Sequence, residues 1–251
     1  MIRPYIDVEK VYKQFRLKRP RKTAFSSLRD ALGGAGRTGP YKKYWAIEDI
    51  SLKAESGDRI GLIGNNGSGK TTLLKIIAGL YMPTTGSVNV KGEARLFTSL
   101  GLGITDELTV SENIYLYGAI CGLTERYVRH KFYDILAFAG LAEFADSRVK
   151  TLSRGMVQRL SFSVAMHVRS DILLFDEVLS LGDKDFQVKS DKVLESYKNS
   201  DMIIIMASHN MDILSGFCEK ILWLDKGKQM AFGPAKEVIG KYLQHNSKGP
   251  E

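Results

Sequence analysis

Apolar and polar residues are distributed along the chain in short periodic stretches that predict strands and helices. Tyr5 to Val11 alternates with the period of two that is typical of a strand, and Trp45 to Lys53 predicts a second strand. A short apolar run within residues 58–63 predicts a buried strand. Thr71 to Leu80 then shows the three-and-four spacing of a helix. A strand, a turn and a helix therefore follow one another directly.

The same analysis extends over the rest of the chain. Residues 109–146 predict helices, with Ser111 and Glu112 opening one and Thr124 capping another that runs to about Gly140. Further strands are expected at Ser87–Val90, Ala94–Phe97, Asp171–Glu177, Met202–Ala207, Ile221–Leu224 and Gln229–Phe232, the last two as a hairpin; further helices are expected at Val157–Val168 and Ala235–Gln244.

The segment from Arg16 to Tyr44 interrupts this pattern and is rich in Arg, Lys and Gly. Within it, Thr23 is expected to cap a short helix that presents Phe25, Leu28 and Leu32 on one face. Residues 1–45 hold 12 Lys and Arg against 3 Asp and Glu, so most of the net charge of +8 belongs to this end of the chain. Such a basic stretch suits an anionic membrane surface or a nucleic acid, and a solvated loop is the plain alternative.

Composition places few other limits on the protein. A hydrophobic fraction of 44% and a charged fraction of 25% are ordinary for a globular protein. The two cysteines, Cys121 and Cys218, do not indicate a disulfide framework and favour a reducing compartment. No signal peptide is apparent, and no apolar stretch approaches the ~20 residues of a membrane helix.

The turn between the predicted strand and helix carries the clearest chemistry. Residues 64–71 fit the P-loop pattern G-x-x-x-x-G-K-[ST] in the strand–turn–helix context that the pattern needs. Glycines let backbone N–H groups converge on a phosphate, and the helix N-terminus adds a favourable dipole. Lys70 is expected to reach the β- and γ-phosphates of a nucleotide, and the Thr71 hydroxyl to ligate Mg²⁺. The predicted nucleotide-binding residues of this loop are Gly64, Asn65, Asn66, Gly67, Ser68, Gly69, Lys70, Thr71 and Thr72.

Three later features gain meaning only beside a P-loop. Asp176, at the end of an apolar strand, suits a second Mg²⁺ anchor, and Glu177 could polarise an attacking water as general base; adjacent acids alone are usually a solvated pair. His209 follows another buried strand and is a candidate γ-phosphate contact, although such a histidine is more often a satisfied core residue. Ser153 and Gly155 precede a helix and offer a second anion site, or an ordinary N-cap.

The order of these motifs resembles the ATP-binding subunit of ABC transporters over nearly the whole chain. Walker A corresponds to Gly64–Thr71, Walker B to Ile172–Asp176, and the signature motif to Leu152–Met156, in which Arg154 and Met156 depart from the commonest form. Leu181–Asp183 matches the D-loop of this family, and His209 matches its switch histidine. Phe15 matches the aromatic residue that stacks on adenine. Thr84 to Val110 contains no glutamine, so the Q-loop residue is missing, and Thr98 or Ser99 stands in its place.

The resemblance implies an α/β fold: a P-loop NTPase ABC-type nucleotide-binding domain with an antiparallel β-subdomain and an inserted α-helical subdomain at 105–155. It implies one ATPase domain over residues 1–251, with a basic insert at 16–44. It also implies ATP and Mg²⁺ as cofactors, and a head-to-tail homodimer in which Ser153 and Gly155 of one subunit complete the ATP site of the other. Glu177, His209 and Lys70 are the implied catalytic residues.

Two stretches are similar to the branch that exports polysaccharides, such as O-antigen and teichoic acid. These are Gly101 to Leu116 and Asp176 to Lys189, and the insert at 16–44 is similar as well. The branch implies a membrane-spanning partner subunit, a lipid-linked glycan as cargo, no nucleic acid, and a peripheral place on the cytoplasmic face of the cell membrane. Some members carry a C-terminal carbohydrate-binding domain, for which this chain is expected to have no room.

Alternative functions remain open from the sequence. The nearest is the ATPase of another transporter, for lipids, drugs or an imported solute. A soluble ABC ATPase acting on nucleic acid or ribosomes is a rival from another class, but such proteins need a long coiled coil or a second cassette. A P-loop kinase would leave Leu152–Met156 and His209 unexplained.

Overall fold

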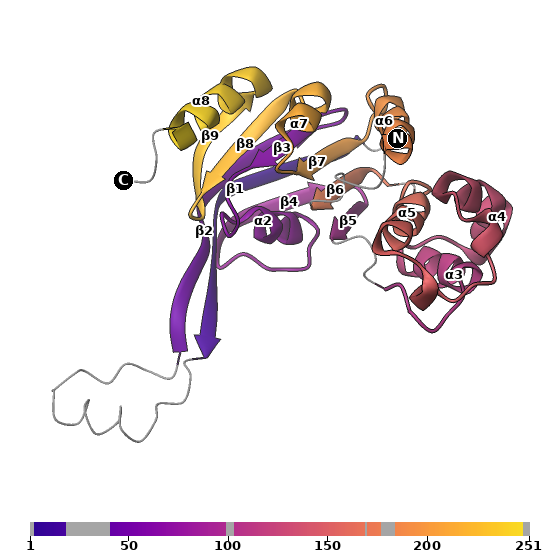
Figure 1. Cartoon of the computed structure of the whole chain (residues 1–251). Helices are drawn as coiled ribbons and strands as arrows, with labels where there is room; N and C mark the ends of the chain where they lie inside the picture. The colour runs from indigo at the N-terminus through magenta and orange to yellow at the C-terminus, as the bar shows by residue number, and fades with distance from the viewer. Residues whose placement is uncertain (1–2, 19–40, 99–102, 169, 177–183, 248–251) are drawn as a thin grey trace.

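A single mixed sheet organises the molecule. The computed structural model describes residues 3–18, 41–98, 103–168, 170–176 and 184–247. Within them, nine strands form one sheet in the order β4-β1-β2-β9-β8-β3-β7-β6-β5 (Figure 1). The strands are β1 (Tyr5–Lys18), β2 (Tyr41–Glu55), β3 (Arg59–Ile63), β4 (Thr85–Lys91), β5 (Ala94–Thr98), β6 (Ile172–Asp176), β7 (Ile203–Ala207), β8 (Lys220–Asp225) and β9 (Lys228–Pro234).

The central strands run parallel and are almost entirely apolar. β3 pairs with β7 on one side and β8 on the other, and β6 lies between β7 and β5. Every residue of β7 is buried, as are the first four residues of β6. Continuous apolar strands of this kind need cover on both faces, because both sets of alternating side chains avoid water.

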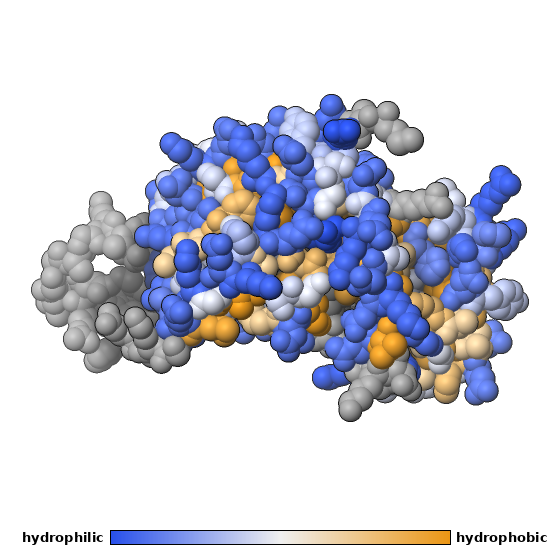
Figure 2. All heavy atoms as spheres, turned by 90° about the horizontal axis from the view of Figure 1, so that it is seen from above, coloured by the Kyte–Doolittle hydropathy of each residue, from blue (hydrophilic) through white to orange (hydrophobic). Residues whose placement is uncertain are grey.

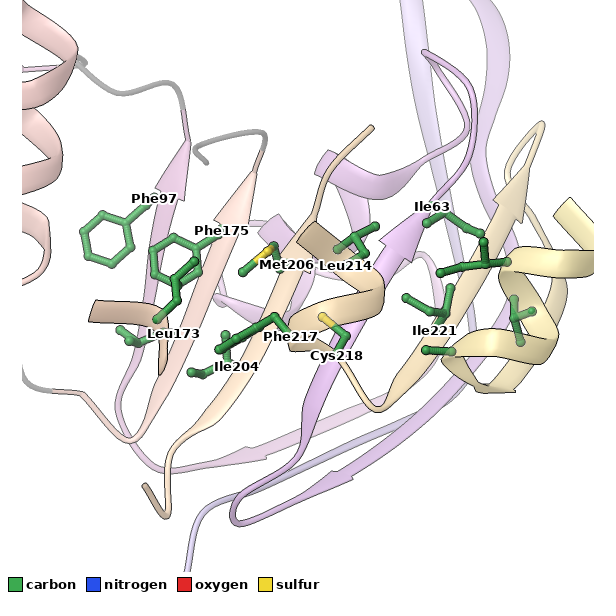
Figure 3. Packing of buried hydrophobic residues seen from close by; sticks show 14 of the residues in the cluster. Ile63, Phe97, Leu173, Phe175, Ile204, Met206, Leu214, Phe217, Cys218 and Ile221 are labelled. Atoms are coloured by element: carbon green, nitrogen blue, oxygen red, sulfur yellow. The ribbon is translucent and has the colours of Figure 1, made fainter. Parts of the chain in front are cut away.

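Helices on the two faces supply that cover. On one face lies α2 (Lys70–Ile77), whose Leu73, Leu74 and Ile77 pack on the sheet. On the other face, α7 (Met211–Phe217) and α8 (Ala235–Ser247) complete a second cluster with side chains such as Leu214 and Phe217 (Figures 1 and 3). α6 (Lys184–Tyr197) adds Phe186 and Leu194 to the same cluster. Seen from above, the outer surface is mostly hydrophilic, with apolar atoms visible in smaller areas (Figure 2).

Three helices form a separate group at one end of the sheet (Figure 1). They are α3 (Val110–Ile120), α4 (Glu125–Ala139) and α5 (Arg154–Ala165), with short 3₁₀ turns at Ala142–Phe144 and Val149–Thr151. Their buried residues make a third apolar cluster of their own. α5 joins this group to the sheet, because its Leu160 belongs to the third cluster whereas its Phe162 belongs to the second, which α7 and α8 complete.

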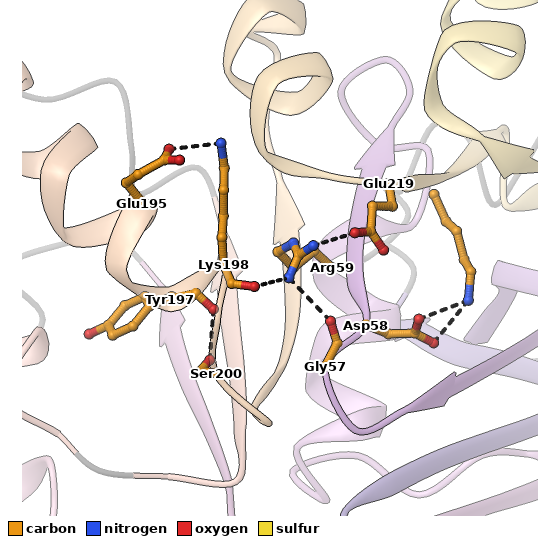
Figure 4. A network of polar contacts seen from close by, with 9 residues as sticks. Gly57, Asp58, Arg59, Glu195, Tyr197, Lys198, Ser200 and Glu219 are labelled. Atoms are coloured by element: carbon orange, nitrogen blue, oxygen red, sulfur yellow. Dashed lines mark hydrogen bonds and ion pairs between the residues drawn. The ribbon is translucent and has the colours of Figure 1, made fainter.

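A polar network fixes the amino ends of the central strands, opposite the P-loop. The Arg59 guanidinium donates to the carbonyl oxygen of Lys198 at 2.6 Å and pairs with Glu219 (Figure 4). Lys220 donates to both carboxylate oxygens of Asp58 at 2.8 and 3.0 Å. β3, β8 and the end of α6 are therefore held together at this edge.

β1 and β2 extend further than the sequence pattern predicts. The expected strands ended at Val11 and began at Trp45, but the pairing continues through Phe15↔Tyr44 and Arg16↔Lys43 to Lys18↔Tyr41. The two strands leave the body of the protein as a ribbon (Figure 1). The prediction was wrong because this part has polar side chains on both faces, whereas backbone pairing does not require an apolar pattern. The helix expected near 23–34 lies outside the described residues.

Most other boundaries agree with the predictions. The hairpin of β8 and β9 turns at Lys226 and Gly227, which both have positive φ, as a tight turn between antiparallel strands needs. Thr124 caps α4 and Gly140 ends it. α5 begins three residues earlier than expected, because the Ser153 hydroxyl accepts from the Met156 N–H and caps it there. α6 and α7 were not predicted at all.

Candidate nucleotide site

The P-loop lines a hollow of about 200 Å³ beside the base of the β1–β2 ribbon. Asn66 to Thr72 form one wall, and Phe15, Tyr44 and Ala46 form the other. The structure therefore brings the predicted loop together with the predicted aromatic Phe15, although they are far apart in sequence. Tyr44 and Ala46 were not singled out from the sequence; the signal that could have found Tyr44 is its position opposite Phe15 in the two strands.

Glycine is required at two positions of the loop. Gly64 has φ +143°, and a Cβ there would lie 2.1 Å from the carbonyl oxygen of Leu224. Gly69 has φ +108°, and a Cβ there would lie 2.6 Å from Ile47 Cγ2. At Gly67 nothing lies within 4 Å of the same position, so the outer side of the loop is open. The loop is therefore pressed against β8 and β2 and opens toward the hollow.

The polar atoms of the loop suit an anion. Lys70 is 6% exposed, and its Nζ donates to the carbonyl oxygens of Gly64 at 2.7 Å and Asn65 at 3.3 Å. Ser68 is 2% exposed, and its Oγ has no hydrogen-bond partner among the described residues. The N-cap of α2 is Gly69, which supplies no side chain to the first N–H groups of the helix. A buried cation, an unpaired hydroxyl and uncapped N–H groups fit the phosphates of a nucleotide.

The carboxyl ends of the parallel strands bring Asp176 toward the same loop. Across the sheet, Thr98 of β5 pairs with Asp176 of β6, which pairs with Ala207 of β7, which pairs with Leu62 of β3. The P-loop begins directly after β3. Asp176 thus lies two strands away from it, about 10 Å along the sheet at ordinary strand spacing. Thr98, one of the two residues expected to replace the Q-loop glutamine, is its half-buried neighbour, whereas Ser99 lies outside the described residues.

His209 also lies at this edge. It follows β7, and its Nε2 is 3.1 Å from Oδ1 of Asn66 in the P-loop. Ser208 beside it is buried, and its Oγ accepts from the N–H of Asn210, which caps α7. The junction between β7 and α7 therefore holds the imidazole against the loop.

The signature residues lie elsewhere. Ser153 and Gly155 are at the start of α5, in the helical group, and do not line the hollow (Figure 1). Glu177 and Leu181–Asp183 lie outside the described residues. Of the predicted site, the structure brings Phe15 and His209 to the P-loop and places Asp176 two strands away at the same edge of the sheet.

Both cysteines are free thiols, and burial raises their pKa, to about 11 for Cys121 and about 12 for Cys218. They stay protonated at neutral pH and take no part in the candidate site.

The strand–loop–helix geometry and the edge carboxylate define a P-loop nucleotide-binding protein. Comparison with known proteins narrows the class. The family model described as ABC transporter matches residues 47–180. An O-antigen export system ATP-binding protein of Klebsiella pneumoniae is 39% identical over 81% of this chain and 82% of its own length. The chain belongs to the ABC transporter family, as an ATP-binding protein with ABC-type ATPase architecture.

Other relatives agree with this assignment. A teichoic acids export ATP-binding protein of Lactococcus lactis is 35% identical over 94% of this chain, which spans 50% of that relative's length. A dimeric ATP-binding cassette bound to ADP and Pi has the same fold, with a TM-score of 0.71 over 92% of this chain and 98% of its own, at 19% identity. Among the helices that the structure describes, none is both long and apolar enough to cross a membrane.

Proposed function

We propose that this chain is the ATP-hydrolysing subunit of an ABC transporter that exports a lipid-linked cell-surface polysaccharide of the O-antigen or teichoic acid type. The observation that carries the proposal is the 39% identity to an O-antigen export protein over 81% of this chain. The stretches Gly101–Leu116 and Asp176–Lys189 support it, because they match this branch of the family.

The site residues divide the work of phosphoryl transfer to water. Lys70 and the N–H groups of residues 64–72 would hold the β- and γ-phosphates, and Thr71 and Asp176 would hold Mg²⁺. Bound Mg²⁺ would supply positive charge against the charge that develops on the phosphate oxygens. Glu177 orients and deprotonates the attacking water, and His209, which contacts Asn66 of the P-loop, holds the γ-phosphate. Phe15 stacks on adenine at the mouth of the hollow.

A groove between the sheet and the helical group is the proposed contact for the membrane subunit. It has a volume of about 240 Å³ and is lined by residues such as Leu80, Phe97 and Ile120. Leu80 is 63% exposed and Ile120 55%, although both are apolar. Thr98 lines the groove and is the strand partner of Asp176, so one strand pair connects the groove to the nucleotide site. Binding there places the subunit on the cytoplasmic face of the membrane.

The proposal is tested by deleting the gene in its host and measuring surface polysaccharide. We expect surface glycan to fall and lipid-linked glycan to accumulate inside, because the cargo is made but not moved. Wild-type protein should restore export and Lys70→Ala should not, whereas Lys236→Ala, at an exposed position of α8, serves as the matched control. Unchanged surface glycan in the deletion strain, with altered handling of a lipid, drug or solute, would assign the chain to another transporter.

A further inference from the structure

The part of the ribbon beyond the nucleotide site carries an unbalanced positive charge. We call residues 16–18 and 41–43 the distal ribbon. It contains Arg16, Lys18, Lys42 and Lys43 and no acidic residue. Arg16 and Lys43 are direct partners across the two strands. Like charges at facing positions weaken a strand pair, so this arrangement is favourable only where anions gather around it.

The distal ribbon also exposes large apolar and aromatic side chains. Leu17 is 52% exposed and Tyr41 51%, and Trp45, which pairs with Gln14 at the base of the ribbon, is 39% exposed. Leu17 lies between Arg16 and Lys18 in one strand, and Tyr41 precedes Lys42 and Lys43 in the other. Tyr and Trp beside Lys and Arg are typical of the zone where a protein meets lipid headgroups, because the rings prefer the interface and the cations attract anionic phosphates.

Contacts at the base of the ribbon fix the side of the molecule on which it stands. Lys13 donates to the carbonyl oxygen of Met82 at 2.7 Å, and the ring of Phe15 meets that of Tyr81 edge-on at 5.5 Å. Tyr81 and Met82 directly follow Leu80, at the rim of the groove proposed for the membrane subunit. The ribbon leaves the sheet on the side of α2 (Figure 1). It therefore stands beside the groove and on the same side.

We infer that the distal ribbon binds the headgroups of anionic phospholipids at the membrane surface. The argument from the groove rests on the proposed function, because that function makes the groove the contact for the membrane subunit. The charge and the exposed rings of the ribbon do not depend on it. The surface attracts the cations of the ribbon within a Debye length, and the aromatic side chains enter the headgroup layer. A nucleic acid would account for the charge and the rings of the ribbon but not for its position beside the groove. A lipid surface accounts for all three observations.

The test is sedimentation of the full-length chain with vesicles of phosphatidylcholine containing 30% phosphatidylglycerol, and with phosphatidylcholine alone. We expect the wild type to bind the anionic vesicles more tightly and to lose binding as NaCl rises. The variant Arg16→Gln/Lys42→Gln/Lys43→Gln should bind about 100-fold more weakly, from about fivefold for each of the three cations removed. Circular dichroism and basal ATP hydrolysis report that this variant is folded, since none of the three residues lines the hollow.

A matched control removes the same charge from exposed positions of α6 and α8, on the other face of the sheet: Lys192→Gln/Lys236→Gln/Lys241→Gln. This control should bind like the wild type. Equal loss in both triple variants would mean that net charge and not the ribbon attracts the vesicles, and would overturn the inference. Wild-type binding to a single-stranded oligonucleotide but not to vesicles would overturn it too. The assay contains no glycan and needs no ATP turnover, so its failure leaves the export proposal standing.

Discussion

Lys70 and Glu177 have different proposed roles at the residue scale, and mutation separates them. Replacing Glu177 by Gln removes the general base but keeps the shape of the side chain, so ATP should still bind and turnover should fall about 10²- to 10⁴-fold. Lys70→Ala should weaken binding itself, because the buried ammonium at the centre of the loop is lost. Equilibrium binding of ATP and steady-state hydrolysis measure the two effects. Unchanged turnover of Glu177→Gln would remove that residue from the role.

Tyr44 offers a second aromatic contact for the base of the nucleotide. It faces Phe15 across the strands, lines the same hollow and is 45% exposed. Tyr44→Ala should raise KM for ATP about 5- to 100-fold with little change in kcat, the size of a lost base–aromatic stack. Tyr44→Phe should keep the wild-type KM. Tyr41→Ala removes an equally exposed ring that does not line the hollow, and an equal effect there would contradict the assignment.

Substitution of Gly64 by Ala tests whether the P-loop needs its close contact with β8. An Ala at this position combines φ +143° with a Cβ 2.1 Å from the carbonyl oxygen of Leu224, so the loop must move. We expect Gly64→Ala to lose ATP binding and to lower the unfolding temperature. The control is Gly79→Ala, where φ is +73° but nothing lies within 4 Å of the new Cβ. That change should cost only about 1 kcal/mol of stability and leave ATP binding intact. Equal behaviour of the two variants would argue against the contact.

The start of α3 supplies a pH-dependent contribution at the element scale. Thr109 and Glu112 form a reciprocal capping box, in which the N–H of Thr109 donates to the Glu112 carboxylate at 2.8 Å. This bond, with that from the Thr109 hydroxyl, lowers the pKa of Glu112 below its ordinary 4.5. The stabilisation is therefore present above that ordinary pKa, which the unfolded chain has, and is lost as pH falls through the lower folded-state value.

We accordingly expect Glu112→Gln to unfold at a lower temperature than the wild type at pH 7, and the difference to vanish in acid. Thr109→Ala should lower stability by about 1 kcal/mol, the usual cost of an N-cap, whereas Thr109→Ser should retain it. Thermal unfolding followed by circular dichroism between pH 3 and pH 7 measures both. A Glu112→Gln difference that persists unchanged at pH 3 would contradict the charged cap.

The elements also show what the sequence could predict. The P-loop and the hairpin at Lys226 were predictable, because glycine positions and apolar runs are local signals. The family assignment is confirmed by the family model and by the Klebsiella relative. The length of the ribbon and the role of Tyr44 were not predictable, because both depend on pairing between residues on either side of an insert. α6 was missed because its apolar positions, such as Phe186 and Leu194, are widely spaced among charges.

At the scale of the whole molecule, the position of α5 leaves the proposed ATP site incomplete. Ser153 and Gly155 lie in the helical group, whereas the hollow is lined by the P-loop and the ribbon. A head-to-tail pair of chains would bring the α5 N-terminus of one copy to the phosphates held by the other. A C₂ pair of this kind contains two equal ATP sites, each built from both chains. Hydrolysis per chain should then rise with protein concentration, as association completes the sites.

Mixing two inactive variants tests this arrangement directly. Lys70→Ala has a defective P-loop but an intact α5, and Ser153→Arg has the reverse. If the site is shared, a mixed pair contains one complete site and one doubly defective site. In an equimolar mixture half of the pairs are mixed, and half of the sites in those pairs are complete. The mixture should therefore recover up to about a quarter of wild-type turnover. Each variant alone should stay inactive at every concentration.

The mixture of Lys70→Ala with Glu177→Gln is the control, because both defects fall on the same side of the site and no complete site can form. Absence of recovery in the first mixture, with pairing verified by cross-linking, would place Ser153 outside the site; recovery in both mixtures would show that the chains do not share sites in this way.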